Sequence, residues 1–305
     1  MGPLSCCKIC FLHDKKRDRG GPVLKFEQYA RPASTKEAYD LLQENRLATV
    51  IGGMMWLRLS DRTIPIGIDL SGCGLDRIEE TDDAFVIGAM VTLGQLENHE
   101  AFARMTRNVF TDGVHDIIGT QFRNLATVGG SAYARMGFSD IVTALLPLDT
   151  WVEFTGAGTM RFADFVNGGA ARDVLERIVV RKHDYRASFQ CVRNSATDFS
   201  TLNVCAALWD DEWHLAVGAR PKKAKFLEGD ELALPRDFTP DELAAACERA
   251  RYLNYGTDRR ASADYRAELA EVLSRRAILT AANQLDVETE LRLAAEAAKP
   301  KGVIQ

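Results

Sequence analysis

Residues 127–154, TVGGSAYARMGFSDIVTALLPLDTWVEF, carry the strongest signal in the sequence. A glycine pair, Gly129 and Gly130, follows a β-branched run there, and the apolar segment 141–148 comes directly after Asp140. Because glycine has no Cβ, the backbone of the pair can turn sharply and bring its N–H groups close to a ligand. We therefore predict that this stretch clamps the diphosphate of a nucleotide cofactor.

A second glycine pair, Gly52 and Gly53, follows another β-branched run at residues 49–51. Backbone N–H groups exposed at such turns form anion-binding concavities, and two of them together could hold a diphosphate without a lysine. Either pair alone is more often an ordinary tight turn. Their coincidence favours a cofactor site without establishing it.

Polar residues near the later pair have both structural and functional interpretations. Asp140 stands at the expected start of a helix, where aspartate is a favoured N-cap. This role is preferred to the alternative, a hydrogen bond to a ribose or ribityl hydroxyl. Arg123 and Asn124 could contact phosphate, but an ion pair or a turn contact within the fold is at least as well supported.

The bulk composition excludes several classes of protein. The 305 residues suffice for two domains, and the net charge of −5 with scattered Lys and Arg gives no footprint for nucleic acid. No apolar run approaches the roughly 20 residues that span a bilayer. The first residues lack the pattern of a secretory signal. We expect a cytoplasmic protein.

The seven cysteines show no regular spacing, which argues against a disulfide framework. Cys6, Cys7 and Cys10 form C-C-x-x-C, with only His13 nearby as a further ligand, so a metal or iron–sulfur site is weakly indicated. An N-terminal tail at residues 1–24 without a metal is the preferred interpretation, and we predict no metal site.

Motifs of common catalytic sites are missing. The sequence has no G-x-G-x-x-G after a strand, no P-loop, no G-x-S-x-G elbow and no zinc-type histidine spacing. No acid–base pair is recognisable, so we predict no catalytic residue. A protein that holds a cofactor, with the cofactor supplying the chemistry, fits this pattern.

Hydrophobic periodicity predicts a chain of mixed helices and strands. A capping box at Ser34 and Glu37 predicts a helix at 36–45, and further helices are expected at 92–100, 108–118, 140–148, 241–253, 263–285 and 288–298. Strands are expected at 25–29, 48–51, 64–70, 84–89, 151–154, 158–162, 175–181, 185–192, 201–209 and 213–218. The change to antiparallel strands predicts a domain boundary near residue 182.

The run QFRNLATVGGS at 121–131, followed by Ser139-Asp140 and by ALLPLD at 144–149, resembles the FAD-binding medium subunits of molybdenum hydroxylases. These are the subunits of the xanthine dehydrogenase and carbon monoxide dehydrogenase type. Their pattern is roughly R-N-x-A-T-[VI]-G-G-N, then D, then P-A-L-L-A-L-D. The similarity extends over about residues 25–285, and its most specific part is the second glycine pair.

The resemblance implies an α+β, two-subdomain, FAD-binding fold of the PCMH type, similar to vanillyl-alcohol oxidase. A small C-terminal domain of antiparallel sheet and helices would follow. The implied organisation is a tail at 1–24, the FAD-binding domain at 25–182, a CO dehydrogenase flavoprotein-like domain at 183–285 and a helical tail at 286–305.

The resemblance also implies two loops that bind the pyrophosphate. The first loop would consist of Val50, Ile51, Gly52, Gly53, Met54 and Met55. The second would consist of Thr127, Val128, Gly129, Gly130 and Ser131. Asp140 would hold a ribose or ribityl hydroxyl, Leu175 would line the flavin or adenine pocket, and Gln190 would lie near the flavin.

Three positions depart from the family pattern. Met54-Met55 replaces a polar pair such as Thr-Asp, Ser131 replaces Asn, and Gln190 stands where a lysine is common. Backbone contacts survive these changes, so FAD is still expected to bind. Neither loop has a Cys or His suited to covalent attachment, and the binding is expected to be non-covalent.

The resemblance predicts an oxidoreductase subunit that is active only in a complex. Electrons would pass from [2Fe-2S] clusters of a small subunit to this flavin and then to an acceptor such as NAD, while a molybdopterin-binding large subunit oxidises the substrate. Two alternatives remain open: a scaffold subunit that has lost its flavin, and a stand-alone flavoprotein oxidoreductase.

Overall fold

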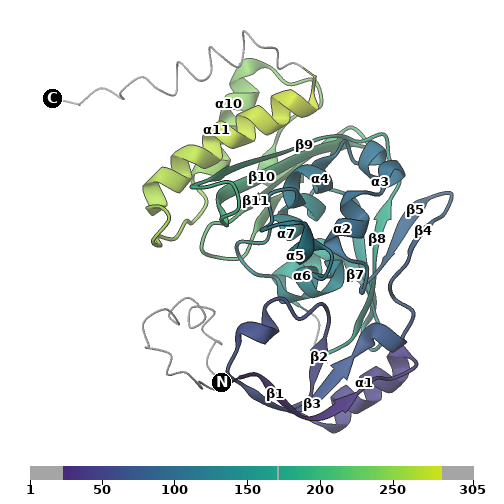
Figure 1. Ribbon diagram of the computed structural model, residues 1–305. Coiled ribbons are helices and arrows are strands. Elements are labelled where there is room, and N and C mark those ends of the chain that lie inside the picture. Colours follow the sequence, from purple (N-terminus) through teal and green to yellow (C-terminus); the bar gives the residue numbers. More distant parts are fainter. Residues whose placement is uncertain (1–22, 170–171, 284–305) are drawn as a thin grey trace.

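The computed structural model describes residues 23–169 and 172–283, and it confirms the predicted α+β class. Three separate sheets follow one another along the chain. In Figure 1 the first sheet lies at the bottom, the second in the middle, and the third at the top beneath two long helices. The two predicted C-terminal segments at 286–305 and 288–298 lie outside the described residues, as do Cys6, Cys7 and Cys10.

The first sheet and one helix form the part of the chain that we call the lower lobe. The sheet is parallel, with strand order β1-β3-β2, so β3 lies between the other two. Ser34 starts the helix because its hydroxyl accepts from the N–H of Glu37 at 3.2 Å, as predicted. The other half of the predicted capping box differs, since the Glu37 carboxylate accepts from the N–H of Ala33 instead of Ser34. The elements are β1 (Lys25–Ala30), α1 (Thr35–Glu44), β2 (Thr49–Ile51) and β3 (Thr63–Asp69).

The second sheet has five strands in the order β4-β5-β8-β6-β7, and all its pairings are antiparallel. Its strands are β4 (Ile78–Glu80), β5 (Ala84–Gly88), β6 (Thr150–Phe154), β7 (Gly158–Arg161) and β8 (Leu175–Arg181). Short helices connect and cover them: α2 (Leu93–Glu97), α3 (Glu100–Met105), α4 (Val109–Val114), α5 (Thr120–Arg123), α6 (Val128–Ala134), α7 (Asp140–Leu145) and α8 (Phe162–Asn167).

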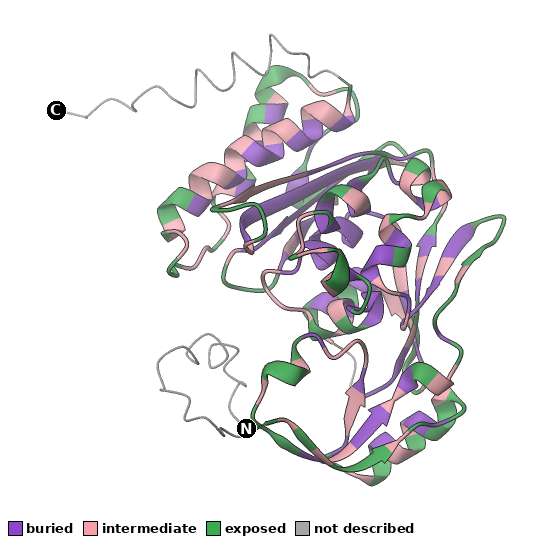
Figure 2. Cartoon of the chain, viewed as in Figure 1, coloured by how far each residue is buried: buried purple, intermediate pink, exposed green. Residues whose placement is uncertain are grey.

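The third sheet is antiparallel, with strand order β12-β11-β10-β9. Its strands are β9 (Arg186–Arg193), β10 (Ser200–Trp209), β11 (Glu212–Gly218) and β12 (Lys225–Leu227), followed by α9 (Gly229–Leu232), α10 (Pro240–Arg251) and α11 (Ala263–Ala281). Strand β10 is buried along almost its whole length, as Figure 2 shows. It is covered on one face by α11 and on the other by α7, so both faces of the strand are apolar or hydrogen-bonded.

Most predicted elements are confirmed, with a few corrections. The helix expected at 92–100 is two helices, because Asn98 ends α2 and His99 caps α3. The expected helix at 108–118 stops at Val114. Strands β4 and β12, of three residues each, were not predicted because they are too short to show a periodic pattern.

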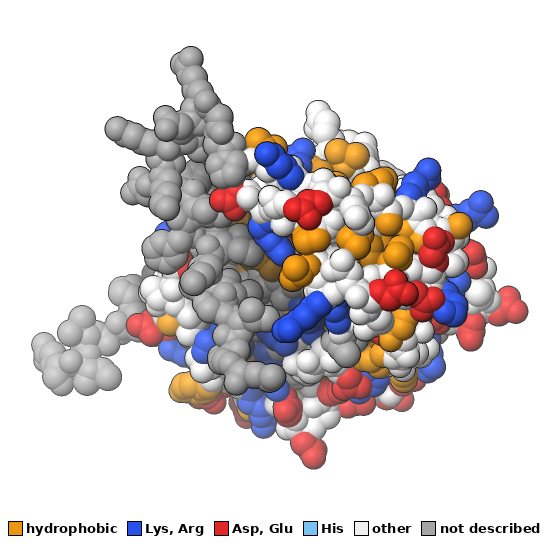
Figure 3. Space-filling view, turned by 90° about the horizontal axis from the view of Figure 1, so that it is seen from below, with side chains coloured by type: hydrophobic (Ala, Val, Ile, Leu, Met, Phe, Trp, Pro, Cys, Tyr) orange, Lys and Arg blue, Asp and Glu red, His pale blue; other side chains and the backbone are white. Residues whose placement is uncertain are grey.

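Figure 3 shows apolar, acidic and basic side chains interspersed over the described part of the lower face. This mixture agrees with the net charge of −5. Among the described residues, no helix is both long and apolar enough to cross a membrane.

His214 of β11 gives the fold a dependence on pH. Its ring is stacked between Trp209, at a centroid distance of 4.4 Å, and Phe226, at 6.0 Å. Neither ring nitrogen has a hydrogen-bond partner among the described residues. Burial lowers the pKa of His214 below its usual 6.5, although nearby Glu212 and Glu228 oppose this shift.

A histidine whose pKa is lowered by folding stabilises the fold fully above pH 6.5, and its contribution is lost as the pH falls below that value. We predict that His214 lowers the free energy of unfolding by up to about 1.4 kcal/mol for each pH unit below pH 6.5. Chemical denaturation at pH 7 and pH 5 measures the pH slope, that is, the change in the free energy of unfolding between the two pH values. His214→Phe should remove the part of this slope that comes from His214. His115→Phe, on the surface, is the control, and equal slopes for His214→Phe and the wild type would contradict the prediction.

Candidate cofactor-binding site

The two glycine pairs predicted from the sequence lie against each other in the structure. A Cβ added to Gly52 would come within 2.8 Å of the Thr127 hydroxyl and 3.9 Å of the Gly130 Cα. One added to Gly53 would overlap the carbonyl oxygen of Leu125. The loop after β2 therefore packs directly on the segment that leads into α6, and only glycine allows this approach.

The first loop presents free hydrogen-bond donors. No N–H group of Gly52, Gly53, Met54 or Met55 donates to any acceptor within the described residues. Met54 has a φ of +59°, a left-handed conformation that methionine rarely adopts. Successive N–H groups around a left-handed residue form a concavity that binds anions. The first loop thus combines free N–H groups with a left-handed residue, two features of backbone concavities that bind anions.

The second loop differs from the prediction. Residues Gly129 and Gly130 do not form a turn after a strand; they lie in the first turn of α6, which Thr127 caps by accepting from the Gly130 N–H at 3.1 Å. The next donors are also engaged within the fold. Val128 donates to Val91, Gly129 to Ala89 and Ser131 to Thr127, at 2.8–3.0 Å.

The saturation of these donors changes what the second loop can contribute. Its backbone N–H groups are not available to a ligand in this geometry. Gly130 is exposed and Gly129 is buried, where an added Cβ would lie 2.5 Å from Ala89. The second loop therefore offers a surface without side chains beside the first loop, together with the hydroxyl groups of Thr127 and Ser131.

Asp140 is the first residue of α7 and is only 4% exposed. The predicted cap role is wrong, because the preceding Ser139 caps the helix by accepting from the Val142 N–H. The Asp140 carboxylate accepts three hydrogen bonds from the third sheet: from Ser200 at 2.6 Å, Asn203 at 2.5 Å and the Arg193 guanidinium at 3.0 Å.

The fold buries two opposite charges here, the Asp140 carboxylate and the Arg193 guanidinium. Burial raises the pKa of Asp140, whereas Arg193 and the two hydrogen-bonding side chains oppose that rise. The Arg193 side chain is only 6% exposed, and its Nε lies 3.7 Å from Asp116 without a hydrogen bond. These two buried charges depend on each other, because Asp140 has no other cation against it among the residues that the structure describes, and Arg193 would keep only the more exposed Asp116 as a counter-charge.

Arg123 serves the fold, as its structural interpretation predicted. Its Nε donates to Glu97 at 2.6 Å, and both side chains are about nine-tenths buried. Asn124 ends α5 and its side chain lies against Gly94, where an added Cβ would meet the Asn124 oxygen.

Three other predicted site residues lie at a distance from one another. Val50 is half-buried in β2, beside the first loop. Leu175 is buried in β8, paired with Phe154. Gln190 of β9 lies opposite Val204 and donates to Ser188 at 3.0 Å.

Strand alternation separates Gln190 from Asp140. Gln190 shares its face of the sheet with Val192, which packs in the cluster beneath α10 and α11. Arg193, one residue further, lies on the opposite face with Asp140. Arg193, and not Gln190, is therefore the β9 side chain that contacts Asp140.

Reasoning from the sequence did not identify the groups that surround Asp140 and the first loop. Three of these groups, Arg193, Ser200 and Asn203, belong to the third sheet, far along the chain from Asp140, and no local sequence motif marks them. Three aromatic residues beside the site, Trp56, Phe138 and Phe199, were also missed. Their positions one or two residues from Met55, Asp140 and Ser200 were the available signal.

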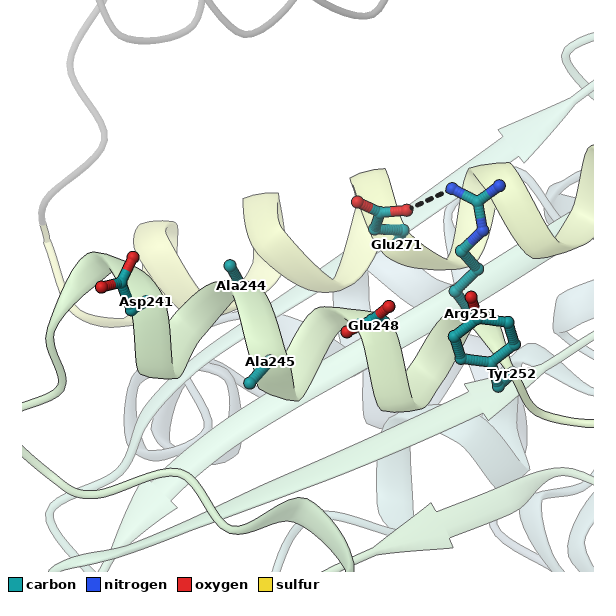
Figure 4. Close-up of a pocket in the computed structure, with 7 residues that line it drawn as sticks. All are labelled: Asp241, Ala244, Ala245, Glu248, Arg251, Tyr252 and Glu271. Atoms are coloured by element: carbon teal, nitrogen blue, oxygen red, sulfur yellow. Dashed lines mark hydrogen bonds and ion pairs between the residues drawn. The ribbon is translucent and has the colours of Figure 1, made fainter. Parts of the chain in front are cut away.

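A shallow groove of about 380 Å³ on the outer side of α10 is unrelated to the glycine loops. Figure 4 shows it lined by the small side chains of Ala244 and Ala245 and by acidic groups, with Arg251 turned toward Glu271. Its carboxylates would repel a diphosphate. In the part of the chain that is described, no cluster of His, Cys, Asp or Glu could hold a metal ion.

Comparison with known proteins supports a flavin site. The family described as the FAD binding domain in molybdopterin dehydrogenase matches residues 24–182, more than half of the 305 residues. The nicotine 6-hydroxylase medium subunit of Paenarthrobacter nicotinovorans is 28% identical over 276 residues, covering 83% of this chain and 96% of that protein. The nicotinate dehydrogenase FAD-subunit of Eubacterium barkeri is 27% identical over 177 residues, 52% of this chain and 59% of that subunit.

Solved structures share the fold. A carbon monoxide dehydrogenase from Hydrogenophaga pseudoflava matches with a TM-score of 0.78 at 21% identity, over 86% of this chain and 99% of the matched chain. Quinoline 2-oxidoreductase from Pseudomonas putida 86 matches with a TM-score of 0.74, also at 21% identity, over 85% and 98%.

The fold, the paired glycine loops and these relatives define an FAD-binding subunit of an oxidoreductase. The chain belongs to the family of FAD-binding domains of molybdopterin dehydrogenases.

The residues present fit this cofactor. The four free N–H groups from Gly52 to Met55 suit a diphosphate, and the glycine surface of α6 leaves room beside them. FAD supplies the redox chemistry when bound. The part of this chain would be to bind and orient the cofactor.

We predict that Asp140→Ala destabilises the chain by about 3–5 kcal/mol, because it breaks the closer ion pair of the buried Arg193 and leaves only Asp116, at 3.7 Å, as a counter-charge. Chemical denaturation measures this. Asp116→Ala is the matched control: its carboxylate is 43% exposed and should matter by less than about 1 kcal/mol. Combining Asp140→Ala with Arg193→Met should recover part of the loss, and strict additivity of the two changes would refute the coupling.

Proposed function

We propose that this chain binds FAD non-covalently between its two glycine loops and relays electrons within a molybdenum hydroxylase-type complex. The observation that carries the proposal is the set of free N–H groups at Gly52–Met55, in a loop that packs against the glycine surface of α6. Backbone donors suffice for a diphosphate, so the lost hydroxyl at Met54-Met55 is tolerated. Thr127, Ser131 and Asp140 would add polar contacts, and Leu175 would line the pocket.

The proposed partners are a molybdopterin-binding large subunit and a small subunit with [2Fe-2S] clusters. Electrons from the clusters would reach the flavin, and an external acceptor such as NAD would remove them. The relatives support this place in a complex, since one is named as a medium subunit and another as an FAD-subunit. A cytoplasmic location and a domain boundary near residue 182 belong to the same proposal.

A scaffold subunit without flavin is the second candidate. The saturated N–H groups of Val128–Ser131 favour it, because half of the predicted backbone clamp is already engaged. Titration of the full chain with FAD, followed by flavin absorbance, decides between the two candidates. A chain that takes up no FAD would overturn our proposal and leave the scaffold.

We predict that Gly52→Ala weakens FAD binding about 10–100-fold. The new Cβ would crowd the Thr127 hydroxyl at 2.8 Å and force the first loop away from α6, at a cost of about 1–3 kcal/mol. Equilibrium titration of flavin fluorescence measures the effect. Gly119→Ala is the control, because its Cβ would make only an ordinary contact of 3.6 Å with Gln121. An unchanged FAD affinity for Gly52→Ala would show that the cofactor does not use this loop.

A further inference from the structure

Three aromatic rings connect the lower lobe to the rest of the protein. The Trp56 ring lies 5.5 Å from those of both Phe138 and Phe199, and the two phenyl rings are 4.4 Å apart. Trp56 comes from the end of the first loop, Phe138 from the segment between α6 and α7, and Phe199 from the turn between β9 and β10. We call this cluster the aromatic bridge.

The aromatic bridge lies beside the proposed cofactor site. Trp56 follows Met55 directly, at the end of the loop with free N–H groups. Phe138 is two residues before Asp140, and Phe199 adjoins Ser200, whose hydroxyl donates to Asp140 at 2.6 Å. The three rings thus span the distance between the first loop and Asp140.

The phenyl side of the bridge is held in place. The Arg260 guanidinium lies over the Phe199 ring at 4.9 Å and pairs with Asp198 at 3.1 Å. Ser200, the neighbour of Phe199, is buried and hydrogen-bonded to Asp140. The Phe199 ring is therefore held on one face by Arg260 and through both of its chain neighbours, Asp198 and Ser200.

The Trp56 side is held much less firmly. The other three indoles donate hydrogen bonds: Trp151 to Asp149, Trp209 to Pro147 and Trp213 to Arg236. The indole of Trp56 has no hydrogen bond among the described residues and is 42% exposed. It caps a 3₁₀ turn of only three residues, η2 (Leu57–Leu59), so stacking is its main restraint.

We propose that the aromatic bridge is a gate of the cofactor site and that Trp56 is its moving part. The proposal rests on FAD binding between the two glycine loops. FAD enters when Trp56 leaves the two phenyl rings, and the bridge re-forms behind it. Because the same contacts must break for entry and for escape, the gate slows both rates and leaves the affinity nearly unchanged.

The test measures the association and dissociation rate constants of FAD by stopped-flow fluorescence on the full chain. Trp56→Ala should raise both rate constants about tenfold, because opening the gate would no longer break two aromatic contacts of ordinary strength. The Kd should change by less than about threefold. Trp56→Phe keeps an aromatic ring and should stay within about threefold of the wild type. Leu59→Ala, in the same turn and 58% exposed, is the matched control and should change neither constant.

The outcomes separate the gate from the proposed function. A wild-type chain that takes up no FAD overturns the proposed function and the gate together. If the wild type binds FAD but Trp56→Ala has wild-type rates, the gate alone is wrong. A rise in the dissociation rate constant without a rise in association would place Trp56 against bound FAD and would equally refute a gate.

Discussion

The buried carboxylate of Asp140 holds the third sheet onto the FAD-binding domain. It begins α7, yet all three of its donors belong to β9 or β10. A carboxylate that is 4% exposed is costly unless every acceptor position is used, so its partners must sit at fixed places. This requirement sets the position of β10 over α7, and with it the position of Phe199 beside the first loop.

The same constraint gives the site its asymmetry. Phe138, Phe199 and Asp140 lie in a part of the chain where the Asp140 carboxylate already accepts three hydrogen bonds, whereas the first loop belongs to the lower lobe and keeps its donors free. Binding energy for a diphosphate therefore comes mainly from one side. The other side supplies a glycine surface whose value lies in having no side chains.

The sequence predicted correctly those features whose determining residues lie close together in the chain. The helix at α1 was predictable because Ser34 and Glu37 are three residues apart and cap it directly. The second glycine pair was assigned to a turn because a β-branched run precedes it, but Thr127 caps a helix there instead. The donors of that helix are used by Val91 and Ala89, contacts across nearly 40 residues that no local pattern contains.

The residues around Asp140 were hidden for the same reason, since its partners lie 53–63 residues further along the chain. Family resemblance supplied a cofactor role for Asp140 and could not reveal that its carboxylate already has three donors. Any contact with a ribityl or ribose hydroxyl must therefore be added to this network or must displace one of its members. Displacing a neutral donor, Ser200 or Asn203, costs less than displacing the Arg193 guanidinium, which is buried and charged. Because Ser200 adjoins Phe199, a cofactor contact that displaced Ser200 from Asp140 would also shift the Phe199 ring of the aromatic bridge.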